Sequence, residues 1–320
     1  MVRSKFCFFM VVGLLVSSLA FAGASKEKYP KEVNISFVES PFNLQIMVMK
    51  EQGLLEKAFA GKNVTVKWHT ITSGAQQTQA MAAGSLDIAS VVNSTSLILA
   101  NAAGNRVDAA AVVSRPKQTF ALLTGPDGPR SVRELRGKTV AGPKGTVLHQ
   151  MLIAALVANG MSAADVNFIQ MDLPEARTAL LSGNVDGALQ AAALIIRDQE
   201  AGMRVLFTAD GYVTPLLLSA VRPAFARDYP ELLQIYMDTQ KEAYEWILAN
   251  TVEAVAIGSK IQQISEADGA RLYAWSGMAS VLEQSDLPAL EADVDFLFEQ
   301  GMITQKINPA DFILPAAFAK

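Results

Sequence analysis

One stretch, residues 137–157 with the sequence GKTVAGPKGTVLHQMLIAALV, constrains the fold more than any other part of the chain. Residues 139–141 are typical of a strand, and the glycines and proline of residues 142–145 end it. From Thr146 onward, apolar residues recur at i, i+3, i+4, i+7 and i+8, which predicts a helix with one buried face. A helix that begins at the carboxyl end of a strand presents free N–H groups, which suit an anion or a polar ligand head. An ordinary βα unit without a ligand also accounts for this stretch taken alone.

The first 22 residues predict an export signal. Arg3 and Lys5 precede an uncharged apolar run over residues 6–19, and Ala20-Phe21-Ala22 supplies the small residues of a cleavage site. A membrane anchor is the weaker alternative, because the run is shorter than the ~20 residues that a spanning helix needs. We therefore expect a soluble mature protein in the periplasm, with residues 23–31 as a short polar linker.

Composition and charge exclude several classes of protein. The chain is 51% hydrophobic and 18% charged, which favours a folded core over disorder. Its only cysteine, Cys7, lies in the predicted signal, so the mature chain would have no disulfide. Removal of residues 1–22 would leave 25 basic and 31 acidic residues and change the net charge from −4 to −6, which does not favour binding to nucleic acid. The sequence has no metal-ligand spacing, no P-loop and no dinucleotide fingerprint, so we expect neither a metal nor a cofactor.

Predicted strands and helices alternate in two successive series. The predicted strands cover residues 33–38, 64–71, 86–92, 139–141, 167–171, 186–190 and 204–207. This alternation predicts an α/β fold with mostly parallel sheets flanked by helices. Extended passages at 107–124 and 216–221 indicate a crossing into a second lobe and a return from it.

The same pattern predicts the domain organisation. We assign residues 32–114 to the first part of lobe 1 and residues 115–218 to lobe 2. Residues 219–320 would contain the return to lobe 1 and a helical C-terminal tail, because the pattern is helical almost throughout from Tyr229. We expect this tail to pack on the first lobe.

A short internal sequence repeat supports two similar lobes. Residues 80–89 read AMAAGSLDIA and residues 179–188 read ALLSGNVDGA. In each segment a glycine is placed to end a helix and an aspartate to open a strand. Two such lobes would present the carboxyl ends of their strands to one ligand cleft.

Several segments resemble one known family. They are KEQGLLEKAF (50–59), TSGAQQTQAMAAGSLDIASV (72–91), SVRELRGKTVAGPKGTVLH (131–149), DLPEARTALLSGNVDGAL (172–189) and YEWILANTVEA (244–254). The chain resembles the periplasmic solute-binding proteins of ABC importers for nitrate, sulfonates and taurine, a group that includes binders of thiamin-precursor pyrimidines. The resemblance covers most of residues 33–255. It implies the type II, Venus-flytrap fold of two lobes that close over one ligand, with a membrane permease as partner and the binding protein as a monomer.

The resemblance places the ligand contacts in loops at strand ends. The matching residues are Glu39, Ser40, Phe42, Thr72, Ser73, Gly74, Asn93, Ser94, Thr95, Gly145, Thr146, Val147, His149 and Gln190. Many relatives carry an aromatic residue and an acid or proline in the last loop, whereas this chain has Gln-Ala-Ala-Ala from residue 190, which implies a roomier or less polar wall. The hydroxyl residues in this set can also act as helix caps without any ligand.

Glu39 constrains the ligand if it faces the cleft. A carboxylate would repel a simple anion such as nitrate, so the ligand would then need a cationic or hydrogen-bond-donating group as well. Alternatively, Glu39 turns to solvent or caps the next helix. For His149, a surface or indirect role and direct ligand contact both remain open. We expect a structural role for His69, and for Arg115 a role in fixing the crossing between the lobes.

The sequence therefore predicts the substrate-binding component of an ABC importer that captures a small polar solute, anionic or zwitterionic. A module that senses a ligand and signals to a membrane receptor is the main alternative. An enzyme on the same fold is disfavoured, because the two histidines, His69 and His149, lie far apart and no Gly-x-Ser-x-Gly motif accompanies them.

Overall fold

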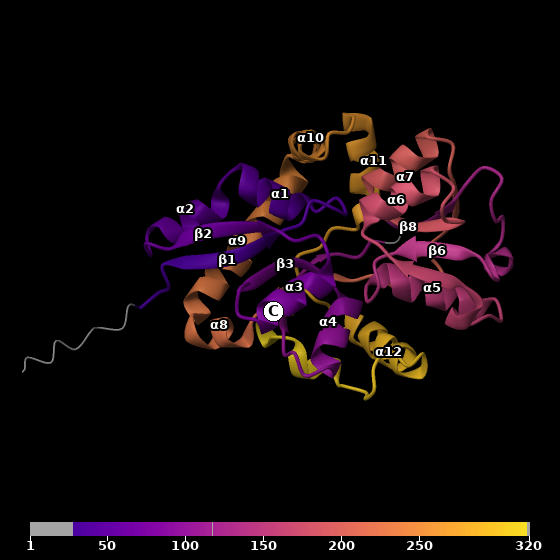
Figure 1. Ribbon diagram of the computed structural model, residues 1–320. Coiled ribbons are helices and arrows are strands. Elements are labelled where there is room, and N and C mark those ends of the chain that lie inside the picture. The colour runs from indigo at the N-terminus through magenta and orange to yellow at the C-terminus, as the bar shows by residue number, and fades with distance from the viewer. Residues whose placement is uncertain (1–27, 117, 319–320) are drawn as a thin grey trace, which may run out of the picture.

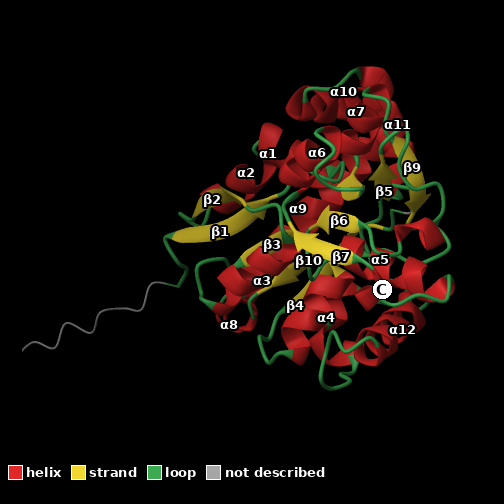
Figure 2. Cartoon of the chain, turned by 45° about the vertical axis from the view of Figure 1, so that its right-hand side comes forward, coloured by secondary structure: helices red, strands yellow, loops and turns green. Residues whose placement is uncertain are grey.

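The computed structural model describes residues 28–116 and 118–318, so the predicted signal peptide lies outside the described part of the chain. Two five-stranded sheets, each flanked by helices, form two lobes that lie side by side (Figure 1). Figure 2 shows both sheets in yellow between layers of helix. Within the described residues, no helix combines the length and the apolar character needed to cross a bilayer.

The sheet of lobe 1 has the order β2-β1-β3-β10-β4. Its strands are β1 (Glu32–Phe37), β2 (Thr65–Thr70), β3 (Ile88–Asn93), β4 (Asp108–Ser114) and β10 (Leu217–Val221). β1 pairs in parallel with β2 and β3, whereas β10 runs antiparallel to both β3 and β4. Four strands therefore share one direction, and the reversed strand is the one that returns from the other lobe.

The sheet of lobe 2 repeats this plan in the order β7-β6-β8-β5-β9. Its strands are β5 (Phe120–Thr124), β6 (Thr139–Gly142), β7 (Asn167–Gln170), β8 (Gly187–Ala191) and β9 (Arg204–Thr208). β5 is antiparallel to β8 and β9, and β6 is parallel to β7 and β8. The reversed strand is again the first one after a crossing, so the prediction of two mostly parallel sheets is confirmed.

The helices cover both faces of each sheet. In lobe 1 they are α1 (Leu44–Glu51), α2 (Leu54–Ala60), α3 (Gly74–Ala82), α4 (Ser94–Ala102), α8 (Pro223–Asp228) and α9 (Pro230–Ala249). In lobe 2 they are α5 (Val147–Ala158), α6 (Leu173–Leu181) and α7 (Ala193–Glu200), with the 3₁₀ turns η1 (Val132–Leu135) and η2 (Ala163–Asp165). The tail adds α10 (Thr251–Gln262), α11 (Glu266–Ser276), α12 (Asp286–Glu299), η3 (Pro309–Phe312) and η4 (Pro315–Ala317).

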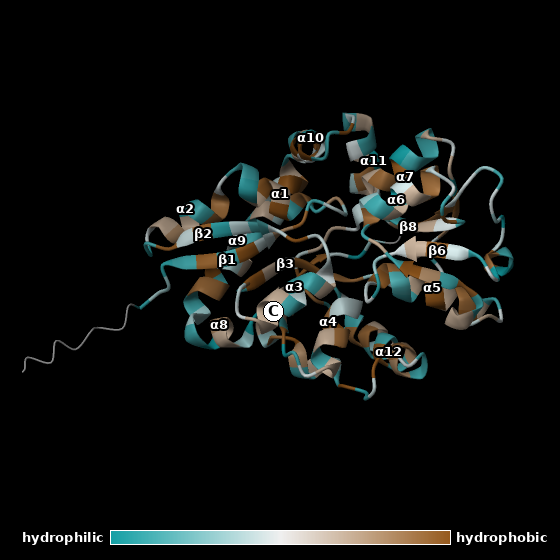
Figure 3. Cartoon of the chain, viewed as in Figure 1, coloured by the Kyte–Doolittle hydropathy of each residue, from teal (hydrophilic) through white to brown (hydrophobic). Residues whose placement is uncertain are grey.

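Helix α5 departs from the predicted one-faced pattern. All of its residues from Val147 to Leu156 are buried, including His149 and Gln150. Figure 3 shows α5 as a mostly apolar helix beneath β6 and β8. The cause is packing on two sides, because α5 contacts β5 and β8 of its own lobe and α4 of the other lobe. The apolar stripe in the sequence identified the face of α5 that packs on its own sheet, and lobe 1 buries the opposite face.

The C-terminal tail spans both lobes, which differs from the expectation that it packs on the first lobe alone. Helix α9 packs on α1 and α2, and α12 packs on α4, but α11 contacts α7 of lobe 2. Arg115, in the crossing, donates from its backbone N–H to the Gly277 carbonyl at 2.8 Å and forms an ion pair with Asp286 of α12. The tail therefore fixes the crossing between the lobes.

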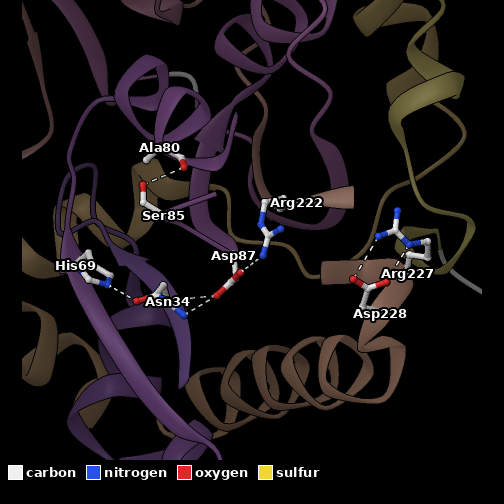
Figure 4. Close-up of polar contacts among 8 residues, drawn as sticks. All are labelled: Asn34, His69, Ala80, Ser85, Asp87, Arg222, Arg227 and Asp228. Atoms are coloured by element: carbon white, nitrogen blue, oxygen red, sulfur yellow. Dashed lines mark hydrogen bonds and ion pairs between the residues drawn. The ribbon is translucent and has the colours of Figure 1, made fainter. Parts of the chain in front are cut away.

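The internal sequence repeat of residues 80–89 and 179–188 corresponds to equivalent hydrogen bonds in the two lobes. Asp87 accepts from the backbone N–H of Asn34 at 3.0 Å, and Asp186 accepts from that of Thr139 at 2.9 Å. Each aspartate precedes a central strand and thereby joins it to the neighbouring strand. Figure 4 shows the contacts of Asp87 with Asn34 and with Arg222, whose guanidinium lies 2.5 Å away. In the same view His69 shares a 2.8 Å hydrogen bond with Asn34, which confirms its structural role.

Candidate functional site

A cavity of about 300 Å³ lies between the lobes, at the carboxyl ends of their strands. Lobe 1 contributes the loops after β1, β2 and β3, and lobe 2 contributes the loops after β6, β7 and β8. Of the predicted ligand residues, those that line it are Glu39, Ser40, Thr72, Ser73, Gly74, Asn93, Thr146 and Val147. The loops that the sequence pattern singled out thus meet around one space.

In lobe 1, helix α3 points its N-terminus at this cavity. Ser73 occupies the N-cap position in an extended conformation, but its side chain accepts no hydrogen bond from the helix. The first N–H groups of α3 therefore remain free for another acceptor. Gly74 lets the start of α3 pack closely on the start of α4, because a Cβ there would lie 2.8 Å from Ser96 Oγ and 3.0 Å from Asn93 Nδ2. The next helix differs, since Asn93 accepts from Ser96 N at 2.9 Å and so caps α4.

In lobe 2, α5 and α7 also begin at the cavity without a side-chain cap. Thr146 is buried at the N-cap of α5, and its hydroxyl donates to the Pro143 carbonyl at 2.8 Å instead of accepting from the helix. Ala192, the N-cap of α7, has no polar side chain and has a positive φ of 49°. Four uncapped helix starts therefore surround the same space. The start of α6 has the Asp172 carboxylate and a proline in its first turn, which leaves the starts of α3, α5 and α7 for an anion. Together they provide backbone donors and partial positive charge for an anion.

The charged residues of the cavity are Glu39, Asp172 and Arg197. Among the described lining residues, Arg197 alone carries a positive charge. Its Nη2 donates to the carbonyls of Gln262 and Gln263 at 2.9 and 3.2 Å, which joins α7 of lobe 2 to the end of α10. The next residue, Asp198, is fully buried and pairs with Arg177 of α6 at 2.6 Å, which holds α7 in place.

Gln262 contacts both sides of the cleft. Its side-chain N–H₂ donates to the Glu39 carbonyl, and its own carbonyl accepts from Arg197. Its Oε1 is buried and has no hydrogen-bond partner within the described residues. The contacts of Gln262 therefore link the loop after β1 to α7 across the cleft.

Six predicted ligand residues do not line the cavity. They are Phe42, Ser94, Thr95, Gly145, His149 and Gln190. The ring of Phe42 is buried against Gly258 of α10, where a Cβ would lie only 2.6 Å from the ring. Gln190 is fully buried and donates to the Leu173 carbonyl at 3.1 Å. Each of these residues is engaged in packing or hydrogen bonds behind the cavity wall, Gly145 through its backbone carbonyl.

His149 lies behind the helix start, not in the cavity. Its ring packs against Phe168 of β7, with 4.6 Å between ring centroids. Burial, aided by the nearby Lys144 charge, lowers the His149 pKa from 6.5 to about 4. The imidazole is therefore neutral at physiological pH and adds no charge to the site. Of the roles that the sequence left open for His149, the indirect one matches this placement, whereas a surface location and direct contact with the cavity do not.

The sequence reasoning missed three polar residues of the cavity: Asp172, Arg197 and Gln262. Asp172 had a usable signal, because it precedes a Leu-Pro helix start directly after a strand. Arg197 lies one turn inside α7 and Gln262 ends a helix of the tail. No local pattern distinguishes these two from ordinary helix residues, since only the tertiary fold brings them to the cleft.

Two α/β lobes with a cavity between their strand ends form the architecture of the periplasmic binding proteins. A solved structure of this fold, the alkanesulfonate-binding protein SsuA from Xanthomonas axonopodis pv. citri bound to MOPS, has a TM-score of 0.79. It is 20% identical, and the match covers 89% of this chain and 98% of that one. This likeness confirms the predicted two-lobed fold.

The chain belongs to the NMT1/THI5-like family, whose model matches residues 46–254. A Bacillus subtilis (strain 168) protein to which aliphatic sulfonate binding is provisionally assigned is 27% identical over 309 residues, 95% of this chain and 92% of its own length. The taurine-binding periplasmic protein of Escherichia coli (strain K12) is 23% identical over 251 residues, 77% of this chain and 74% of its own length. The relatives named are binding proteins, and the family predicted from the sequence motifs is confirmed.

Proposed function

We propose that this protein is the extracytoplasmic binding component of an ABC importer for an organic sulfonate. The observation that carries the proposal is the convergence of three uncapped helix starts, from α3, α5 and α7, on one cavity between the lobes. A sulfonate has three oxygens that accept hydrogen bonds over a wide range of directions. It can therefore be held by backbone N–H groups from both lobes at once, which links binding to lobe closure.

The rest of the cavity favours a ligand with an apolar body over a small inorganic anion. Much of the wall consists of Val38, Val91, Phe120, Leu173, Leu194 and Leu217, with alanines from the loop after β8. Nitrate would leave most of this surface without contacts, whereas an alkyl or ring group would be removed from water against it. The apolar loop after β8 supports the roomier, less polar wall expected from the Gln-Ala-Ala-Ala sequence.

The acceptors at the Glu39 end favour a sulfonate that also carries a donor or a positive charge. Glu39 and Asp172, both acidic, line the cavity. A zwitterion such as MOPS or taurine would place its sulfonate at the helix starts and its ammonium group near these acceptors. Two relatives agree with this chemistry: a structural relative holds MOPS, and a sequence relative is named for taurine binding.

A thermal-shift series tests the ligand class. MOPS and taurine should raise the melting temperature most, ethanesulfonate less, and nitrate least. Isothermal titration would then give the dissociation constants. If 4-amino-2-methylpyrimidine stabilised the protein and no sulfonate did, the pyrimidine-binding alternative would replace this proposal. Turnover of any of these compounds by the pure protein would support the enzyme alternative.

Transport needs a separate experiment in cells. Deletion of the gene should abolish uptake of the radiolabelled sulfonate, and a plasmid copy should restore it. Uptake that continues without the gene, together with loss of a transcriptional response to the sulfonate, would support the sensory alternative. Localisation in the periplasm and a monomeric state belong to the same proposal, and cell fractionation and light scattering test them.

A further inference from the structure

Three of the residues expected to bind ligand, Ser94, Thr95 and Gly145, instead join the two lobes to each other. Helices α4, α5 and α12 come together on one side of the cleft (Figure 1). There Ser94 contacts Asp293 of α12, Thr95 contacts Gln150 of α5, and the Gly145 carbonyl accepts from Ser96 of α4. Asp293 accepts from Gln150 of α5 at 2.6 Å and from Ser94 of α4 at 3.3 Å. One carboxyl group from the tail therefore contacts the starts of helices from both lobes.

Further hydrogen bonds across the same interface surround this contact. The Thr95 hydroxyl donates to Gln150 Oε1, so the amide of Gln150 is bonded at both ends. The Ser96 hydroxyl donates to the Gly145 carbonyl at 2.9 Å. Ser94, Thr95, Ser96 and Gln150 are all at most 2% exposed. These bonds exist only while the lobes are together, since α4 and α5 belong to different lobes.

The Asp293 carboxylate is partly buried and has no cation to compensate its loss of hydration. Within the described residues, the two groups that donate to it, an amide and a hydroxyl, are neutral. Arg115 borders the same small cavity but is ion-paired with Asp286. A charged carboxylate in this position therefore loses hydration without gaining an ion pair, which favours its neutral form.

The elements packed against Asp293 contribute few other charges. Helix α4 and residues 214–216 carry none, and α5 carries only His149, whose ring faces Phe168. The remaining charged groups on α12 itself are acidic: Asp286, Glu291, Asp295 and Glu299. Asp286 is paired with Arg115 and Asp295 with Lys306, so these charges largely cancel. The hydrogen bonds from Gln150 and Ser94 lower the Asp293 pKa, but the loss of hydration outweighs them and raises it.

We propose that Asp293 is a positioning residue of an interlobe latch, in which Ser94, Thr95 and Gln150 hold the lobes closed and protonation of Asp293 favours closure. This role goes beyond ligand binding, because none of the four side chains lines the cavity. The latch nevertheless acts on the ligand site. It fixes the starts of α4 and α5, and the N-cap residues of these helices, Asn93 and Thr146, line the cavity.

The sign of the pH effect follows from the two conformations. In the closed form, burial raises the Asp293 pKa from 3.8 to about 6. In the proposed open form, Gln150 no longer contacts Asp293 and the carboxyl group is more hydrated, so its pKa returns towards the ordinary value. Closure therefore takes up a proton, and the ratio of closed to open protein rises as pH falls through 6. Between pH 7.5 and 5.0 the two pKa values correspond to about a tenfold change in this ratio.

The distance between the lobes can be measured without any ligand, so the result does not depend on the proposed function. Cys7 is the only cysteine of the sequence, so in a Cys7→Ser background two new cysteines give unique label sites. Ala58→Cys on α2 and Ser182→Cys after α6 lie at exposed positions of the two lobes. Spin labels at these sites report the distribution of open and closed forms by pulsed dipolar spectroscopy.

The wild type should shift towards the closed distance, by about tenfold in the population ratio, between pH 7.5 and 5.0. Asp293→Asn is a neutral isostere whose oxygen can accept from Gln150 and whose N–H₂ can donate to the Ser94 hydroxyl, as a protonated carboxyl group can, so it should resemble the acidic wild type at both pH values. Gln150→Leu should shift the population towards the open form. Asp295→Asn, an exposed carboxylate on the same helix, is the matched control and should retain the wild-type pH response.

Two outcomes would overturn the latch. One is a wild-type distribution that does not change between pH 7.5 and 5.0. The other is an Asp293→Asn variant that keeps the full pH response. Both comparisons rely on the wild type and an isosteric variant, so they remain decisive even if Gln150→Leu fails to fold. Circular dichroism of each variant confirms that the two lobes are folded.

Discussion

The loops after β2 and β3 have similar sequences but different surroundings. Thr72-Ser73-Gly74 and Asn93-Ser94-Thr95 each place small polar residues between a strand and a helix. All three residues of the first loop line the cavity, whereas in the second loop only Asn93 does. Ser94 and Thr95 instead donate to Asp293 and Gln150.

The difference arises from what packs over each loop. Helices α5 and α12 lie over the start of α4, whereas the start of α3 faces the open cavity. A hydroxyl at a helix start can therefore serve a ligand or the contact between lobes, depending on a partner that is distant in the sequence. Variants that separate residues of the cavity from residues behind it test this distinction.

The largest effect is expected for Phe42→Ala. The Phe42 ring is 2% exposed and fills the space above Gly258, so its loss should leave a cavity between α1 and α10. We expect the free energy of unfolding to fall by about 3–5 kcal/mol in urea denaturation. The preference among sulfonates should not change. Phe298→Ala, at an exposed position of α12, should cost less than 1 kcal/mol.

The opposite result would move Phe42 into the ligand site. Near-normal stability combined with loss of MOPS binding would mean that the ring contacts ligand and not the core. That outcome would restore the ligand role that the sequence predicted for Phe42.

Thr146→Leu should abolish ligand-induced stabilisation with a smaller effect on folding. Leu is larger and lacks the hydroxyl that holds the Pro143 carbonyl, so it would fill the cavity beside the start of α5. We expect MOPS affinity to fall about 100-fold, as measured by titration calorimetry. Thr178→Leu is a matched control, because the Thr178 hydroxyl also donates to a proline carbonyl but lies outside the cavity. Equal affinities for the two variants would remove the start of α5 from the site.

The strand-and-loop part of the site was accessible from sequence because its signals are local. A turn that breaks a strand before an apolar helix marks Thr72 to Gly74 and Thr146 without knowledge of the rest of the chain. Arg197, Gln262 and Asp293 gave no such signal, because each lies within or at the end of a helix of ordinary composition. The bridging tail was missed for the same reason, since helical periodicity shows that a face is buried but not what covers it.

Glu39→Gln should weaken the affinity for zwitterionic sulfonates more than the affinity for plain sulfonates. If the carboxylate meets the positive group of a zwitterion, the variant should lose about tenfold in affinity for MOPS or taurine and little for ethanesulfonate. Glu32→Gln, an exposed carboxylate at the start of β1, should change neither affinity. Equal losses for the zwitterionic and the plain sulfonates would mean that Glu39 recognises no charge and acts only through its carbonyl contact with Gln262.

The smallest effect concerns His149, which lies behind the cavity wall. Because burial lowers its pKa to about 4, the unfolded chain binds a proton first as pH falls from 6.5. His149 should therefore cost about 1 kcal/mol of stability by pH 6, and more as pH approaches 4. Asp293, with its raised pKa, has the opposite sign and stabilises the fold as pH falls, so the measurement belongs in an Asp293→Asn background. There, urea denaturation between pH 7.5 and 5 should show a decline that His149→Leu flattens, and an unchanged slope would mean that the imidazole is hydrated in the folded protein.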